Sequence, residues 1–196
     1  MLQDLTYGRL ENEFYDREAT NQDLVICVCK NRILVKRTEE FHVTYPTVAT
    51  VKEWADQNGW KAWGEVHFQY VFRMQDVNYF LWMGDAGETV DDTYHYEEIR
   101  QLSQFETKDV CFAACTAEHL FVWYRNNRFC GHCQTPTVHD HKERMLRCPE
   151  CGNMIFPRIS PAVIIGVTNG EKLLLSKYAG RAYTRYALIA GYTEIG

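Results

Sequence analysis

The pattern of apolar and polar positions predicts two β-hairpins near the start of the chain. Four apolar stretches have strand length: 24–29 (LVICVC), 32–36 (RILVK), 66–74 and 79–83. The polar pair Lys30–Asn31 separates the first two, and the polar segment 75–78 separates the second two, so each is expected to be a turn. The segment 84–93 (GDAGETVDDT) is polar and is expected to be a surface loop.

A short helix is predicted between the hairpins, over residues 47–58. Its apolar residues fall on one face of a helix. Thr50 and Glu53 have the spacing of a capping box, and Gly59 provides an end.

The strongest helical pattern covers residues 107–126. Its apolar residues recur every three or four positions: Val110, Ala113, Ala114, Ala117, Leu120, Phe121 and Tyr124. Thr107 is suited to the N-cap position. The helix would lead the chain through 125–129 (RNNRF) into a cysteine-rich segment.

A second group of strands is predicted after residue 158. Residues 161–168 (PAVIIGVT) and 171–178 (EKLLLSKY) flank Asn169–Gly170, which favours a tight type I′ turn. Residues 186–190 (YALIA) form a further apolar run. We therefore expect strands, rather than helices, in this part of the chain.

Four cysteines form two Cys-x-x-Cys pairs, Cys130 with Cys133 and Cys148 with Cys151, separated by fourteen residues. Two such turns can complete a tetrahedron of thiolates around Zn²⁺, with bonds of about 2.3 Å. Gly131, Pro149 and Gly152 are the small or rigid residues expected in these turns, and the glycines are expected to supply the positive φ that turns backbone N–H groups toward the sulfurs. Two disulfides or four idle thiols are the alternatives. The pattern favours a structural zinc ribbon with no open position for catalysis.

Composition supports a folded protein inside a reducing compartment. The chain has 196 residues, 46% hydrophobic, with no apolar run near the ~20 residues that span a membrane. Its start has no signal-peptide pattern, and with eight cysteines we expect a cytoplasmic protein without membrane contact. The four cysteines outside the pairs are expected to be small buried apolar residues: Cys27, Cys29, Cys111 and Cys115.

The net charge of −5 is distributed unevenly. Residues 1–124 carry 11 Lys and Arg against 21 Asp and Glu, a net charge of −10. Residues 125–158 carry 6 against 3, and residues 159–196 carry 4 against 2. The acidic part is therefore a poor binder of polyanions, whereas the modestly basic part could meet a phosphate-bearing ligand or be an ordinary solvated face.

The last residues resemble the start of the Nudix signature, a Gly followed by five residues, a Glu, seven residues and Arg-Glu. Gly191 to Gly196 match the first six positions, so the first signature Glu would come directly after Gly196. With RFCGHC, RCPEC and FPRISP, the segment makes the chain similar, from about residue 99 onward, to the NADH pyrophosphatase family of Nudix hydrolases. The fold implied is α+β: an N-terminal α+β module (1–124), the ribbon (125–157) and the first strands of an incomplete Nudix α/β/α domain (158–196).

This resemblance implies cleavage of the pyrophosphate of NADH or NAD⁺, giving a nicotinamide mononucleotide and AMP. Some members also remove an NAD cap from RNA, and members are usually homodimers. The Glu-rich signature helix binds the catalytic Mg²⁺ or Mn²⁺, which neutralises charge on the diphosphate. The chain as given would be the front portion of such an enzyme, without its catalytic residues, and we expect it to be inactive on its own. A nucleic-acid-binding or dimerisation module built on the ribbon is the alternative.

Few site residues carry over from the family. The four paired cysteines match the zinc ligands. Ala190 matches the position whose main-chain carbonyl helps to bind the catalytic metal, and Tyr192 matches an aromatic position that stacks on the nicotinamide or base. For Tyr192, local packing is an equal alternative, and Glu194 is expected to be a solvated carboxylate.

Several polar residues of the ribbon have simpler interpretations. His139-Asp140-His141 is expected to be a polar loop, with a second metal site as a minor alternative. His132 is expected to be exposed rather than a ligand. Three arginines could contact a substrate phosphate but are more simply solvated: Arg144, Arg147 and Arg158.

Overall fold

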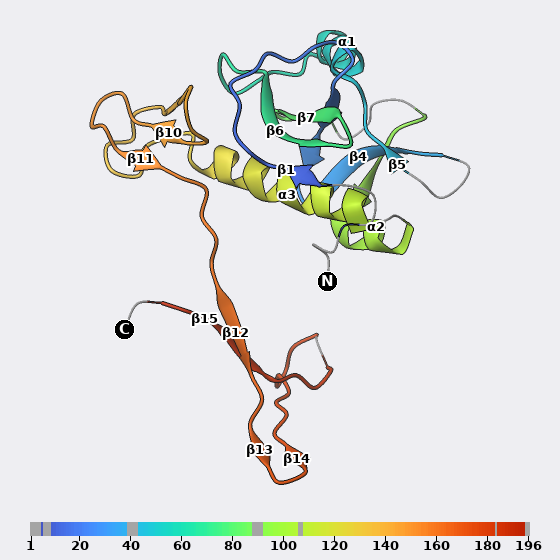
Figure 1. Ribbon diagram of the computed structural model, residues 1–196, viewed down its shortest axis with the longest axis vertical. Helices are drawn as coiled ribbons and strands as arrows, with labels where there is room; N and C mark the ends of the chain where they lie inside the picture. Colours follow the sequence, from blue (N-terminus) through green and yellow to red (C-terminus); the bar gives the residue numbers. More distant parts are fainter. Residues whose placement is uncertain are drawn as a thin grey trace. The chain divides into compact units, whose positions relative to one another are not determined.

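The computed structural model describes residues 5, 9–38, 43–87, 92–105, 108–182 and 184–194 (Figure 1). The chain divides into two compact units, Met1–Pro157 and Arg158–Gly196. Helices and strands occur together, which confirms the α+β class. The three-domain division at residues 124 and 157 stays a prediction.

The first unit contains both predicted hairpins, both predicted helices and the cysteine-rich segment. Its elements are, in order, β1 (Leu10–Glu11), β2 (Leu24–Ile26), β3 (Val28–Cys29), β4 (Arg32–Arg37), β5 (Val43–Thr44), α1 (Val48–Asn58), β6 (Phe68–Met74), β7 (Val77–Trp82), β8 (His95–Glu98), α2 (Ile99–Phe105), α3 (Lys108–Asn126), β9 (Val138–His139), β10 (Leu146–Arg147) and β11 (Met154–Ile155).

The chain moves from one sheet to another at Cys27. Strand β2 pairs in parallel with β7, in a sheet of order β1-β6-β7-β2. Strand β3 pairs antiparallel with β4, which also pairs with β5 and β8. The single strand expected over 24–29 is therefore two short strands in different sheets.

Alternation along this segment places side chains in two cores. Val25 and Cys27 lie in a cluster with α1 and Trp82. Ile26 and Val28 lie in a larger cluster with α3. Figure 1 shows the sheet of β6 and β7 between α1 and α3, so the unit has a helix on each side of its strands.

Helix α1 has well-defined caps, and its N-cap differs from the one expected. Thr47 is the N-cap, and its side chain accepts a hydrogen bond from the backbone N–H of Thr50 at 3.3 Å. The expected capping box starting at Thr50 is therefore wrong, because Thr50 occupies the third helical position. Gly59 ends the helix with φ 67°, as predicted, and the left-handed conformation suits glycine.

The second hairpin has a tighter turn than expected. Strand β7 starts at Val77, so only Gln75 and Asp76 connect it to β6. Their φ values of 50° and 63° are those of a two-residue type I′ turn. The expected four-residue turn at 75–78 is therefore wrong.

Helix α3 matches the predicted long helix, and residues 99–105 before it form α2, which the sequence pattern did not indicate. The expected N-cap, Thr107, lies outside the described residues. Strand β8 was also missed, because its sequence HYEE is polar. Its buried Glu97 accepts a hydrogen bond from the guanidinium of Arg37 on β4, which offsets the burial of the carboxylate.

The cysteine-rich segment is anchored to the first unit at two points. Leu146 in β10 is 2% exposed and belongs to the larger core. The β6–β7 ladder shifts register between Tyr70 and Phe72, which leaves Val71 as an extra residue. The guanidinium of Arg144 donates a hydrogen bond to the carbonyl of Val71. Arg144 thus satisfies a backbone group at the irregularity.

The second unit consists of short strands with exposed apolar side chains. These strands are β12 (Ala162–Ile165), β13 (Thr168–Asn169), β14 (Lys172–Leu173) and β15 (Ile189–Tyr192). The β13–β14 turn is formed by Gly170–Glu171, one residue later than expected, with Gly170 at φ 59°. The described residues of this unit include none that is buried. Among the described helices, none has the length and apolar character to cross a bilayer.

We predict that Arg144→Ala lowers the free energy of unfolding by about 1–3 kcal/mol, because the Val71 carbonyl loses its partner in a partly buried place. The matched control is Arg147→Ala. Arg147 is an exposed arginine of the same segment, 3.7 Å from Asp140, and its loss should change stability by less than about 0.5 kcal/mol. Urea unfolding measures both, and equal losses would contradict the role of Arg144.

Candidate metal centre

Two similar turns position the four paired cysteines. Cys130 N–H donates to the Thr135 carbonyl at 2.8 Å, and the Cys130 carbonyl accepts from Gln134 N–H at 2.9 Å. Cys148 repeats this with Asn153 at 2.9 Å and Gly152 at 3.0 Å. The two turns therefore have the same backbone hydrogen bonds around their first cysteine.

The fifth residue of each turn has a left-handed backbone. Gly152 has φ 73°, and Gln134, at the same place in the first turn, has φ 65°. The role expected of Gly131 is therefore taken by Gln134, a non-glycine residue in a region that side chains disfavour. In both turns a backbone N–H also faces a sulfur: His132 N–H lies 3.4 Å from Cys130 Sγ, and Cys151 N–H lies 3.5 Å from Cys148 Sγ.

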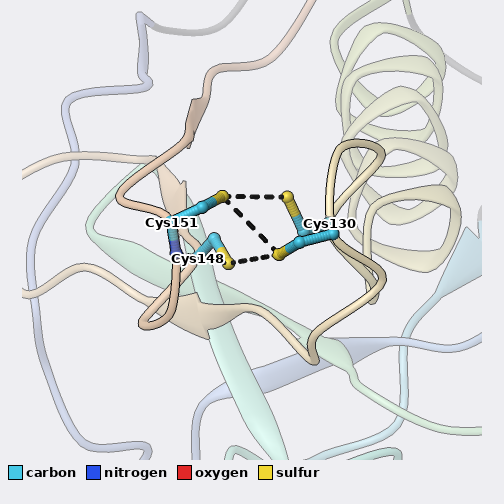
Figure 2. A group of neighbouring side chains, drawn as sticks. Cys130, Cys148 and Cys151 are labelled. Carbon is cyan, nitrogen blue, oxygen red and sulfur yellow. Dashed lines mark hydrogen bonds between the residues drawn. The ribbon is translucent and has the colours of Figure 1, made fainter.

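The four sulfur atoms converge on one point (Figure 2). Cys130 Sγ is 3.6 Å from Cys151 Sγ, and Cys133 Sγ is 3.4 Å from Cys148 Sγ and 3.6 Å from Cys151 Sγ. All four lie within 4.8 Å of one another. A tetrahedron with bonds of about 2.3 Å has sulfur–sulfur edges of about 3.8 Å, close to these distances. They far exceed the ~2.05 Å of a disulfide, so the disulfide alternative is wrong.

The proton equilibria of the thiols fit a site that is completed by a cation. Hydrogen bonds from the backbone at Cys133 and His132 lower the pKa of Cys130 to about 6. The Thr135 side chain and backbone lower the pKa of Cys133. The Asn153 backbone lowers the pKa of Cys151, but burial and three neighbouring sulfurs outweigh it and raise that pKa to about 12. Ionising all four thiols thus requires a compensating positive charge, which Zn²⁺ supplies.

Two neighbours of the sulfurs were not identified from the sequence. Thr135 Oγ1 lies 3.4 Å from Cys133 Sγ, and Asn153 Nδ2 lies 3.6 Å from Cys130 Sγ. Each follows a cysteine of its own turn by two residues, so position within the turn is the signal that could have identified them. They orient the sulfurs rather than bind the metal.

The polar tip between the cysteine pairs does not form a second metal site. His139 stacks on Tyr124, with ring centroids 5.1 Å apart. Asp140 accepts hydrogen bonds from the backbone of Lys142 and Glu143, and His141 lies 2.7 Å from Asp16. Within the described ranges, the four cysteines form the one group of three or more His, Cys, Asp or Glu side chains able to hold a metal ion.

The remaining predicted residues are spread over both units. His132 is exposed, as expected. Arg144 is only partly exposed, and its guanidinium donates a hydrogen bond to the Val71 carbonyl. Among the unpaired cysteines, Cys27 and Cys111 are buried as expected, whereas Cys29 and Cys115 are only partly buried.

Ala190 and Tyr192 both lie on β15 of the second unit. They pair with Ile164 and Ala162 of β12. The side chain of Tyr192 is 81% exposed, and Glu194 is also exposed. The roles of Ala190 and Tyr192 stay predictions.

We expect one zinc ion per chain in freshly purified, reduced protein, measured by elemental analysis. Cys148→Ser should abolish zinc binding and lower the melting temperature by at least about 5 °C, because metal ligation stabilises the folded segment directly. Cys115→Ser is the matched control: it removes a partly buried thiol from α3 and should retain the zinc. Wild-type protein without zinc would contradict the assignment.

His139 should make stability depend on pH. Burial, followed by the charge of His141, lowers its pKa. On acidification the unfolded chain therefore takes up this proton before the folded chain does. The stabilisation is complete above the unfolded pKa of about 6.5 and is lost as pH falls through the folded pKa. Measured by urea unfolding, the free energy of unfolding should fall less between pH 7.5 and pH 5 for His139→Gln than for wild type. The exposed variant His132→Gln should behave as wild type. The same change in the free energy of unfolding between the two pH values for all three proteins would exclude this effect.

Comparison with known proteins places residues 125–156 in a known domain class, because they match the NADH pyrophosphatase zinc ribbon domain. The chain is similar to proteins called NAD-capped RNA hydrolase NudC. It is 39% identical to that of Pseudomonas aeruginosa over 80 residues, 39% to that of Chromobacterium violaceum over 84 and 36% to that of Stutzerimonas stutzeri over 101.

These matches cover 41%, 43% and 52% of this chain, but 29%, 32% and 37% of the relatives' own lengths. The comparison therefore concerns about a third of each relative. The match of residues 125–156 and the geometry of the four cysteines agree on a structural zinc site. The resemblance of the chain to the NADH pyrophosphatase family of Nudix hydrolases is thereby confirmed.

Proposed function

We propose that the chain is part of a Nudix hydrolase that cleaves the pyrophosphate of NADH or NAD⁺, giving a nicotinamide mononucleotide and AMP. We extend the proposal to RNA with an NAD cap, because the similar proteins are called NAD-capped RNA hydrolases. The observation that carries it is the four-sulfur cluster within a segment that matches the NADH pyrophosphatase zinc ribbon.

The zinc ion has a structural rather than a catalytic role in this proposal. Protein sulfur fills all four positions of the tetrahedron, so no position is left for water or substrate. Cleavage of a diphosphate by water instead needs hard cations with oxygen ligands, and we propose Mg²⁺ or Mn²⁺. In the Nudix signature, the glutamates that bind them follow the position matched by Gly196. We therefore propose that residues 1–196 on their own do not hydrolyse NADH.

Strand β15 would contribute the first contacts to metal and substrate. The main-chain carbonyl of Ala190 is proposed as one ligand of the catalytic cation. Tyr192 is proposed to stack on the nicotinamide or the base, and its 81% exposure leaves the ring accessible for this contact. Stacking on an aromatic ring is tolerant of base identity, which suits a substrate with two different bases.

Assembly and compartment follow from the same proposal. The second unit exposes large apolar side chains on its strands, such as Ile164 at 70% and Leu174 at 53%. Surfaces of this kind are usually covered by other protein, and we propose that the whole protein is a homodimer. All eight cysteines lie in the described residues and none forms a disulfide, which suits a reducing compartment, and we propose the cytoplasm.

The test follows AMP release from NADH, NAD⁺ and NAD-capped RNA in the presence of Mg²⁺ or Mn²⁺, using the natural gene product and residues 1–196 in parallel. Hydrolysis by the natural product alone is expected. Turnover by residues 1–196 of about 1 s⁻¹ or above would show that the active site lies elsewhere.

Tyr192→Ala in the natural product should raise KM about ten-fold, because a stacking contact worth about 1–3 kcal/mol is removed. Tyr178→Ala is the matched control, a tyrosine of the same unit that is 56% exposed. An unchanged KM for Tyr192→Ala would assign the ring to local packing instead.

A nucleic-acid-binding module without hydrolytic activity is the second candidate. The net charge of +3 over residues 125–158 favours it, because cations are needed to bind phosphates. Salt-dependent RNA affinity of the natural product, without release of AMP from any of the three substrates, would favour this candidate over the hydrolase.

A further inference from the structure

A cleft lies where the ribbon meets the N-terminal strands and helix α3. Its volume is about 410 Å³, in the lower part of the range for small-molecule sites. Its lining comes from the loop 63–66, from Met83 after β7, from the end of α3, and from the ribbon on both sides of its first cysteine pair. All belong to the first compact unit, so one unit of the fold contains the whole cleft.

An arginine between two aromatic rings forms one wall of the cleft. The guanidinium carbon of Arg128 is 5.2 Å from the ring centroid of Trp63 and 5.8 Å from that of Phe129. Both distances are in the range of cation–π contacts. Within the described part of the chain, the Arg128 guanidinium makes no hydrogen bond or ion pair. Its N–H groups are therefore available to a ligand.

The two rings differ in how firmly they are held. Trp63 packs on buried Phe121 of α3, with ring centroids 5.2 Å apart, and its backbone N–H donates to the Met83 carbonyl at 2.8 Å. Phe129 has 58% of its surface exposed at the mouth of the cleft. The exposed Phe129 ring therefore offers an apolar face to a flat ligand, and binding there would not disturb the core.

The base of the cleft is preformed. Tyr124 and Leu146 are both 2% exposed, and the imidazole of His139 lies nearly parallel to the Tyr124 ring, with an interplanar angle of 16°. Leu146 and the neighbouring Arg144 attach this part of the ribbon to the sheet. A ligand would therefore meet a rigid surface and would not have to order it first.

The cleft thus combines flat apolar faces, an unpaired guanidinium and a modestly basic surrounding segment. Flat rings and arginine planes are the groups on which unpaired bases stack in single-stranded RNA. The guanidinium can also donate to a phosphate of the same strand. The ribbon, residues 125–157, carries 5 Lys and Arg against 3 Asp and Glu, which permits contact with a phosphate backbone close to the cleft.

We propose that this cleft binds one unpaired nucleobase of a single-stranded RNA, with the base stacked on exposed Phe129 and a phosphate bound by Arg128, which lies against Trp63. The choice of RNA rests on the proposed function, in which the substrate can be a capped RNA. The cleft belongs to the first unit and the proposed catalytic residues belong to the second, and we assign to the cleft the RNA body rather than the pyrophosphate that is cleaved.

Binding is tested with uncapped, fluorescein-labelled octa-adenylate RNA and the zinc-loaded chain, by fluorescence anisotropy at low salt. Phe129→Ala should weaken binding about ten-fold. Phe129→Tyr should bind the RNA about as tightly as wild type, because a stacking ring is kept. Phe156→Ala is the matched control, a ribbon phenylalanine that is 49% exposed and outside the cleft, and should bind as wild type. Elemental analysis checks that each variant retains its zinc.

Two further ligands test the nature of the occupant. A duplex of the same length should bind at least ten-fold more weakly, because paired bases cannot enter the cleft. AMP should compete poorly, because it lacks the neighbouring phosphates. Equal affinity for single strand and duplex, AMP binding as tight as RNA binding, or equal losses in Phe129→Ala and Phe156→Ala would each overturn the proposal.

The outcome is independent of hydrolysis, because the RNA used has no pyrophosphate link to cleave. Failure of octa-adenylate to bind, together with normal AMP release from NADH by the natural product, would overturn this inference and leave the proposed function in place. Octa-adenylate binding that is lost in Phe129→Ala, in a protein that hydrolyses none of the dinucleotide substrates, would support the cleft while the hydrolase proposal fails.

Discussion

Close packing between helix α3 and the strands beside it is the contact on which the rest of the first unit depends. Ala113, Ala114 and Ala117 have no exposed surface, and small side chains of this kind let the helix approach its neighbours closely. The larger residues near its end, Phe121 and Tyr124, then fill the space toward the ribbon. The same helix therefore closes the main core, carries one side of the cleft and leads the chain into the metal centre.

Patterns that depend on neighbours in sequence were predicted well, whereas pairings between distant segments were not. The apolar spacing of α3 is local, and its range was predicted almost to the residue. The division at Cys27 depends on which strands pair with either side of it, and residues 24–29 contain no sign of that choice. Strand β8 was missed for the same reason, because its buried Glu97 is stabilised by Arg37 of β4, a residue 60 positions away in the chain.

The metal centre was likewise predicted in its local features and not in its long-range ones. Its four ligands follow from the spacing of the cysteines, because each turn is local and both must meet at one ion. The left-handed conformation of Gln134 could not be predicted, since residue preferences pointed to Gly131. The interaction between Arg144 and the Val71 carbonyl joins residues 73 positions apart and depends on a strand irregularity that no sequence pattern revealed. The cleft joins Trp63 to Phe129, which are also far apart in the chain.

The anchoring of the ribbon explains the length of the segment between its cysteine pairs. A metal ion requires only that two short turns meet, and far fewer than the fourteen residues at 134–147 could connect them. Here the intervening chain extends to the sheet, where Arg144 and Leu146 attach, and then returns to the second turn. Shortening this segment would leave the ion's own coordination possible while detaching the ribbon from the domain. The number of residues between the two cysteine pairs therefore reflects the distance from the metal centre to the sheet. A ribbon without such a contact could have a different number of residues between its pairs.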